Sequence, residues 1–172
     1  MAINVVRNPA QLTWAMFQPV TSIPGTTEEA QIAPVTSGLE RFRPSRGSDG
    51  RFTMPSLTIT VGIDRRNTIV LKTANKSAQL LAHEQSHLDL LFLTARALAR
   101  ELESVSAESV DDLAASLQEI RDRHAERAEA IDKAYDSETD HSRNRAQQQK
   151  WDAAIVRAMA DRQATEIERM PL

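Results

Sequence analysis

Hydrophobic and polar positions follow two different patterns along the chain. From Leu57 to Ile63, and again over the TIVLK run at 68–72, β-branched residues dominate, which is typical of strands. A polar turn at 64–67 separates the two runs, so this spacing predicts a β-hairpin. From about Lys76 neither Pro nor Gly occurs until Pro171, and strong helix formers dominate.

Three helices are predicted in this second part. The first runs from near Ser77 to about Ser104, Ser106 or Ser109 caps the second, and the third begins near Ser142 or Asn144. Apolar positions recur on one face of the last two helices. They are Val110, Leu113, Leu117, Ile120, His124, Ile131 and Tyr135, and then Trp151, Ala154, Ile155, Ala158 and Met159.

These patterns predict one α+β domain over residues 1–172. A strand and loop part at about 1–75, with a small N-terminal antiparallel sheet, precedes a helical part at about 76–170. The length of 172 residues fits a single compact domain with its own core.

The composition of the chain narrows the range of expected binding partners. With 21 basic and 24 acidic residues and a formal charge of −3, the chain lacks the basic excess that phosphate backbones attract. No nucleic-acid partner is therefore expected. No membrane partner is expected either, because the longest apolar patch is far shorter than the roughly 20 residues that span a bilayer. No secretory signal is recognisable at the N-terminus, which predicts a cytoplasmic chain as synthesised.

The chain has no cysteine and four histidines, so a zinc site would have to use His, Asp or Glu. Two of the histidines belong to His83-Glu84-Gln85-Ser86-His87, which matches H-E-x-x-H. Residues four apart lie on the same helix face, so both imidazoles can bind one metal ion. Glu84 is then placed to act as the general base on a metal-activated water.

The third metal ligand is less clear from spacing. Glu101 and Glu103 lie on the motif's own helix, and Glu101 is about 20 Å from His87 along the axis. His141 is the favoured ligand, because it lies in a polar segment between two helices; Asp136 and Asp140 are the alternatives. His124, on an apolar helix face, is expected to be structural.

Two segments, LLAHEQSHLDL and YDSETDHSRNRAQQQKWDAAI, resemble the bacterial domain-of-unknown-function family 922, with its HEQGHFD and YDxxTxHGxxxxxQxxW patterns. The resemblance implies a zinc-dependent peptidase. It implies His83 and His87 as zinc ligands, Glu84 as the catalytic carboxylate, and a second site block that consists of Tyr135, Asp136, Thr139 and His141. Asp89 matches an acidic position that could orient an imidazole. Ser86 and Ser142 replace glycines of the pattern.

The resulting hypothesis is a zinc metallopeptidase with a minimal zincin-like fold that acts on a protein or peptide. His83, His87 and His141 hold one Zn²⁺ ion, Glu84 is the base and then the acid, and Tyr135 hydrogen-bonds the oxyanion. Two alternatives stay open: a non-catalytic zincin-like interaction module, and a zinc amidohydrolase acting on a non-peptide amide. The relatives that the chain resembles are often exported, and the oligomeric state is open.

Overall fold

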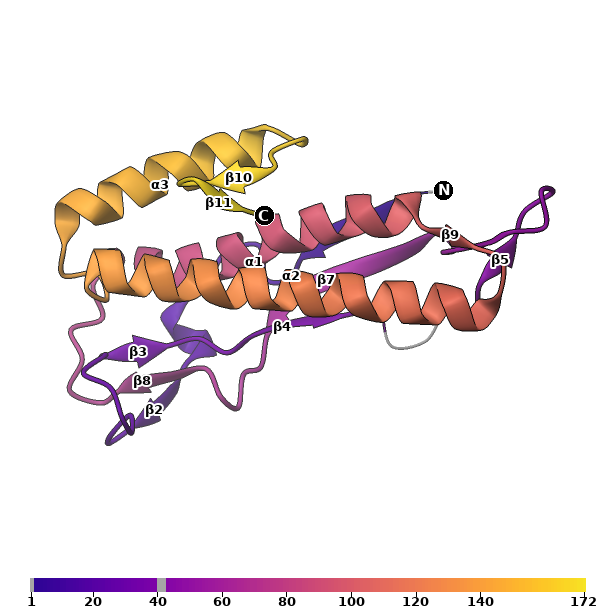
Figure 1. The fold of residues 1–172 in the computed structure, drawn as a ribbon. Coiled ribbons are helices and arrows are strands. Elements are labelled where there is room, and N and C mark those ends of the chain that lie inside the picture. Colours follow the sequence, from indigo (N-terminus) through magenta and orange to yellow (C-terminus); the bar gives the residue numbers. More distant parts are fainter. Residues whose placement is uncertain (1, 40–42) are drawn as a thin grey trace.

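The computed structural model describes residues 2–39 and 43–172, and it is α+β (Figure 1). Three long helices dominate: α1 (Ala78–Ser104), α2 (Val110–Thr139) and α3 (Arg145–Ala160). The strands are β1 (Ile3–Arg7), β2 (Gln18–Val20), β3 (Ala30–Gln31), β4 (Pro34–Ser37), β5 (Ser45–Arg46), β6 (Phe52–Thr53), β7 (Leu57–Ile63), β8 (Ile69–Leu71), β9 (Ser106–Ala107), β10 (Glu166–Ile167) and β11 (Met170–Pro171), and Trp14–Met16 form a short 3-10 helix.

The predicted helix starts are confirmed, because each helix has a side-chain cap. Ser77 accepts a hydrogen bond from the Leu80 amide, and Ser109 accepts one from the Asp112 amide. Asn144 caps α3 in the same way. Each cap satisfies an amide at the helix start that lacks an intrahelical partner, which defines where the helix begins.

The helical part ends earlier than predicted. α3 stops at Ala160, and β10 and β11 pair in the last residues instead of a helix continuing to about residue 170. Two arginines of α1 hold this ending: Arg96 donates to the carbonyl oxygen of Asp161 at 2.6 Å, and Arg100 donates to that of Ala164 at 2.6 Å. These long-range bonds satisfy carbonyls beyond the last helical turn, which local helix propensity does not register.

The predicted hairpin is wrong, because β7 and β8 belong to different sheets. β7 is the centre of one sheet, parallel to β1 and antiparallel to β4. β8 is the centre of another, parallel to β2 and antiparallel to β3. Thr68, just before β8, is fully buried, and its hydroxyl accepts a hydrogen bond from the amide of Ala33, which lies between β3 and β4.

The prediction of one small antiparallel sheet is therefore wrong as well. Among the described residues, two three-stranded sheets are mixed, whereas the third, in the order β5-β6-β9, and the two-stranded sheet of β10 and β11 are antiparallel. β9 follows α1 in the sequence, so this third sheet also joins the helical part to the strand part.

Helix α1 is packed on two sides. Leu88, Leu98 and Leu102 face a core shared with the strands, whereas Leu90 and Leu93 face a second core formed with α2 and α3. A helix buried on opposite faces has little freedom to shift, so side chains on it are held firmly. The predicted inward positions of α2 and α3 are buried or half-buried except at Val110, the first residue of α2, which is exposed.

None of the helices in residues 2–39 and 43–172 is long and apolar enough to cross a membrane.

Candidate metal centre

The two histidines of the H-E-x-x-H pattern lie in α1 and face each other. His83 and His87 are buried, and their Nε2 atoms are 3.3 Å apart. Glu84, between them in the sequence, is only 2% exposed. The helical spacing of four residues therefore places both imidazoles on one side of a buried carboxylate.

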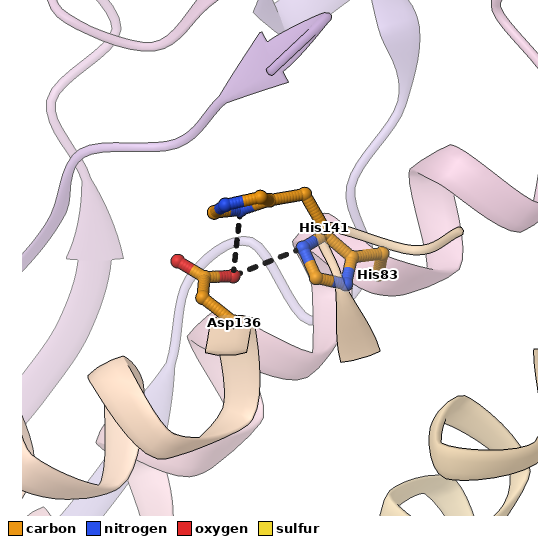
Figure 2. Close-up of side chains that lie close together, drawn as sticks. All are labelled: His83, Asp136 and His141. Atoms are coloured by element: carbon orange, nitrogen blue, oxygen red, sulfur yellow. Dashed lines mark ion pairs between the residues drawn. The ribbon is translucent and has the colours of Figure 1, made fainter. Parts of the chain in front are cut away.

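Helix α2 and the loop after it bring two further donors to the same point (Figure 2). Oδ1 of Asp136 lies 3.0 Å from Nε2 of His87 and 3.2 Å from Nε2 of His83. Nδ1 of His141 lies 3.6 Å from the same oxygen. His83, Asp136 and His141 form one group of possible metal ligands, and His87, Asp132 and Asp136 form another.

The spacing of these donors matches what one ion requires. Zinc bonds of 2.0–2.1 Å in a tetrahedron place neighbouring donor atoms about 3.3–3.4 Å apart. The four separations given above, between 3.0 and 3.6 Å, bracket this value. Moreover, Oδ1 of Asp136 and Nδ1 of His141 are buried, and the polar atoms nearest to them belong to the same cluster of imidazoles and carboxylates.

Both imidazoles of α1 are fixed in the tautomer that metal binding needs. Nδ1 of His83 lies 3.0 Å from the amide oxygen of Gln148, and Nδ1 of His87 lies 2.6 Å from Oδ1 of Asp132. Both oxygens act as acceptors, so a proton belongs on each Nδ1, and Nε2 is the nitrogen left on each ring to bind an ion. Such partners behind metal-ligating histidines orient the ring and raise its basicity.

Tyr135 lies behind the histidines. Its ring stacks on that of His83 with centroids 4.8 Å apart, and its side chain is fully buried. The hydroxyl donates to the carbonyl oxygen of His83 at 3.3 Å and accepts a hydrogen bond from Nε2 of Gln148 at 2.7 Å. In this arrangement the hydroxyl is engaged in supporting His83.

The cluster carries an excess of carboxylates. Glu84, Asp132 and Asp136 adjoin the histidines, and Glu28 lies 3.0 Å from Nδ1 of His141. Among the described residues, none of the four forms an ion pair with Lys or Arg. A divalent cation would balance this charge.

The ionisation of these groups reflects their crowding. Burial raises the pKa of Glu84, against the opposing effect of the two imidazoles. Burial alone would lower the pKa of His87, but the carboxylates of Asp132 and Asp136 raise it to about 10. Burial would raise the pKa of Asp136, but His83 and His87 hold it well below its usual range.

The loop that carries His141 has an unusual backbone. Asp140, His141 and Ser142 all have positive φ angles, of 48°, 50° and 74°. The left-handed region at Ser142 explains why the related pattern has glycine at this position. Nε2 of Gln79 donates to the Ser142 carbonyl oxygen at 2.6 Å, which ties the loop to the first turn of α1.

Not every candidate residue reaches the cluster. Asp140, one of the alternatives for the third ligand, is exposed and pairs with Arg143, whereas Asp136 is at the centre. His124 is buried away from the site, with Nε2 2.9 Å from Glu101. The expectation that Asp89 could orient an imidazole is wrong, because its carboxylate pairs with Arg7 and accepts a hydrogen bond from Gln85.

Three supporting residues were not recognised in these roles from the sequence. Asp132 lies four residues before Asp136, so their shared helix face was a usable signal. Gln148 matches the Gln of the related YDxxTxHGxxxxxQxxW pattern, so that pattern was a usable signal, whereas Glu28 belongs to a distant loop that no spacing rule connects to the first histidine pair.

A small cavity of about 50 Å³ opens beside the cluster. The chain from Glu28 to Pro34, which includes the edge strand β3, forms one wall of it. His83, Glu84, His87, Asp132 and Asp136 form the other. The candidate metal centre is therefore bordered by a small cavity on the side of β3.

The family model for a bacterial protein of unknown function (DUF922) matches residues 44–142, more than half of the chain. The chain belongs to this bacterial family. The matched segment of this DUF922 member contains His83, Glu84, His87, Asp136 and His141 and ends before α3. Neither the curated proteins nor the solved structures give a match to the chain.

Proposed function

We propose that the protein is a zinc-dependent peptidase with a minimal zincin-like fold. The observation that carries this proposal is the convergence of His83, His87, Asp136 and His141 beside the buried carboxylate of Glu84. Nitrogen and carboxylate donors at these separations suit zinc. A carboxylate that adjoins the donors without joining them is what a hydrolase needs as a proton acceptor.

The donors are not equivalent in this proposal. His83, His87 and Asp136 form the inner set, with separations of 3.0–3.3 Å. His141 is the outer donor, because it lies on the loop after α2 and its side chain is 28% exposed. A zinc ion held here would supply an acidified water and polarise a carbonyl group.

Glu84 is the proposed general base. Its Oε2 accepts a hydrogen bond from the Ile32 amide at 3.0 Å, which fixes the carboxylate next to the cavity. Burial raises the pKa of Glu84, which favours a group that takes up a proton and later gives it to the leaving amine. Helix α1 also carries both histidines, so the position of the Glu84 carboxylate relative to His83 and His87 is fixed by the helix.

A peptide is the proposed substrate because the edge strand β3 lies beside the site. β3 is at the edge of the β2-β8-β3 sheet. Glu29 accepts a hydrogen bond from the Leu71 amide of β8, whereas the Ile32 amide bonds to Glu84, so alternate residues face opposite sides. Ala30 therefore presents its amide on the Glu84 side; because Ala30 is 2% exposed, pairing with an extended peptide would require the small cavity to widen.

Tyr135 receives a different role from the oxyanion role predicted from the sequence. Its hydroxyl bonds to the His83 carbonyl oxygen and to Gln148, so we propose that it positions His83. Stabilisation of the oxyanion would require the buried hydroxyl to leave both partners.

The decisive variant is Glu84→Gln, measured with zinc content and with cleavage of a fluorogenic peptide pool. The proposal expects one zinc per chain to remain and cleavage to fall by about 100-fold or more. Glu119→Gln, the same change on the exposed face of α2, is the control and should retain both the bound zinc and the peptide cleavage. Full cleavage by the Glu84 variant would exclude the mechanism.

One observation favours a non-catalytic zinc-binding module as the second candidate. Four protein donors can fill a tetrahedron, and structural zinc sites are closed in that way. Stoichiometric zinc in the unmodified protein without cleavage of any peptide would support this module. Cleavage of simple amides but not of peptides would instead support an amidohydrolase.

A further inference from the structure

A second groove lies away from the metal centre, between β1, the second half of α1 and the end of α3. Its volume is about 570 Å³. Strand β1 lines one side, Phe92, Arg96 and Arg100 of α1 form the floor, and Met159 and Arg162 close the other side. Arg96 is nine residues after His87, about 14 Å along the helix axis, so the groove is separate from the donors.

Strand β1 presents a free backbone edge to this groove. It is one of the two outer strands in the order β1-β7-β4. The Asn8 amide donates to Val61 of β7, whereas the Ile3 amide donates to Glu103, on the opposite side. Because amides alternate along a strand, those of Val5 and Arg7 also face away from β7, and neither has a partner among the described residues.

The charge of the groove is positive. Arg96, Arg100 and Arg162 line it, and Glu103 is the only acidic side chain among its described lining residues. The carboxylate of Glu103 already accepts a hydrogen bond from the Ile3 amide. Arg96 and Arg100 are held in place by carbonyl oxygens at the end of α3, and their guanidinium groups keep their charge there. Arg162 is exposed and forms no ion pair with any described residue.

The floor of the groove is a fixed aromatic ring. The guanidinium carbon of Arg7 lies 5.3 Å from the ring centroid of Phe92, and that of Arg96 lies 5.9 Å from it. Both distances are within the range of cation–π contact with the ring. An apolar side chain entering the groove would contact Phe92, with Met159 nearby.

We infer that this groove binds an extended acidic segment of a partner protein, which adds to the sheet as a strand beside β1. Strand addition uses backbone hydrogen bonds for affinity, and the Val5 and Arg7 amides are available for them. Carboxylates at alternate positions of the added strand would meet the three arginines. Apolar positions in the same segment would meet Phe92.

The test uses a fluorescein-labelled octapeptide of alternating glutamate and valine, with binding to the full chain followed by fluorescence anisotropy at low ionic strength. A lysine–valine octapeptide of the same length is the control ligand and should not bind. Arg162→Glu should weaken binding of the acidic peptide by about tenfold. Arg65→Glu, the same charge change in the exposed turn before β8, should leave it unchanged.

Val5→Pro tests the strand edge itself. It removes an amide that faces away from β7, so the sheet keeps its hydrogen bonds, and binding should fall by about fivefold or more. Circular dichroism checks that the variant folds. If it does not fold, the binding measurement with Arg162→Glu tests the inference instead. Equal binding of the lysine peptide, or of a single-stranded oligonucleotide, would overturn the inference, as would unchanged binding by the Arg162 variant.

Discussion

Oδ1 of Asp136 lies 3.0 Å from Nε2 of His87, although the two residues are 49 positions apart in the sequence. The contact joins α2 to α1 at the level of the H-E-x-x-H pattern. It places a carboxylate among the imidazoles, with His141 as the outer member of the set. The proposed donors can therefore be ranked by their contribution to zinc affinity, and this ranking can be measured.

Asp136→Asn should lose more zinc affinity than His141→Gln. Loss of a residue that only supports a ligand already costs about 10–100-fold, so loss of an inner donor should exceed about 100-fold. His141→Gln should weaken zinc binding less, because His141 is 3.6 Å from Asp136 and partly exposed. Competition titration with a chromophoric chelator measures both. The reverse order would make His141 the principal third ligand.

Asp132→Asn should weaken zinc binding by about 10–100-fold without removing a donor of the inner set. The carboxylate lies 2.6 Å from Nδ1 of His87 and keeps the proton on that nitrogen. Asp122→Asn provides the control, since Asp122 is on the same helix but exposed and bonded to Gln118. Equal affinities for the two variants in isothermal titration would contradict the orienting role.

Tyr135→Phe separates two possible roles of the hydroxyl. If it supports His83, the free energy of unfolding should fall by about 1–2 kcal/mol, because the His83 carbonyl and Gln148 each lose a buried partner. Urea denaturation measures this change. If the hydroxyl binds an oxyanion, kcat should instead fall by about 100-fold or more while the stability of the protein stays nearly constant.

Zinc should raise the melting temperature of the protein. Carboxylates crowd the site, and a ligand at 100 times its Kd stabilises the folded state by about 2.7 kcal/mol. For a chain of this length the melting temperature should rise by about 5–10 °C. Differential scanning fluorimetry with zinc and then with a chelator measures the shift. His83→Ala should abolish it; a shift of equal size in that variant would place the ion elsewhere.

Gly38→Ala tests the end of strand β4. Gly38 has a φ angle of 102°, and a Cβ atom there would lie 2.1 Å from the Thr58 carbonyl oxygen. The change should cost more than about 2 kcal/mol of unfolding free energy. Gly25→Ala is the matched control, with a φ angle of 77° and nothing within 4 Å of the added atom, and should cost about 1 kcal/mol. Equal costs would mean that the close approach to β7 is relieved without penalty.

The helices could be predicted from the sequence because their determinants are local. Ser77, Ser109 and Asn144 cap α1, α2 and α3 with their own side chains, and each was among the expected start positions. The end of α3 depends on arginines of α1, more than 60 residues earlier. No local pattern reports such a contact.

Strand pairing and the full donor set were harder to predict for the same reason. β7 pairs in parallel with β1, a contact between strands more than 50 residues apart, whereas proximity in sequence favoured pairing with β8. The His83–His87 pair follows from one helical turn. Asp136 was an alternative rather than the favoured ligand, because sequence separation does not show which side chain of a polar block points inward.

The position of α3 has a consequence for how this family's segment can be used experimentally. Residues 44–142 include all four donors, yet Gln148 lies beyond them and β1 and β3 lie before them. A fragment cut at those limits would lose the hydrogen bond to Nδ1 of His83, both outer strands of the β7 sheet, β1 and β4, and one wall of the cavity. Expression of the matched segment alone should therefore give a chain that retains the H-E-x-x-H motif but lacks the strands and the hydrogen bond that surround it in the full chain.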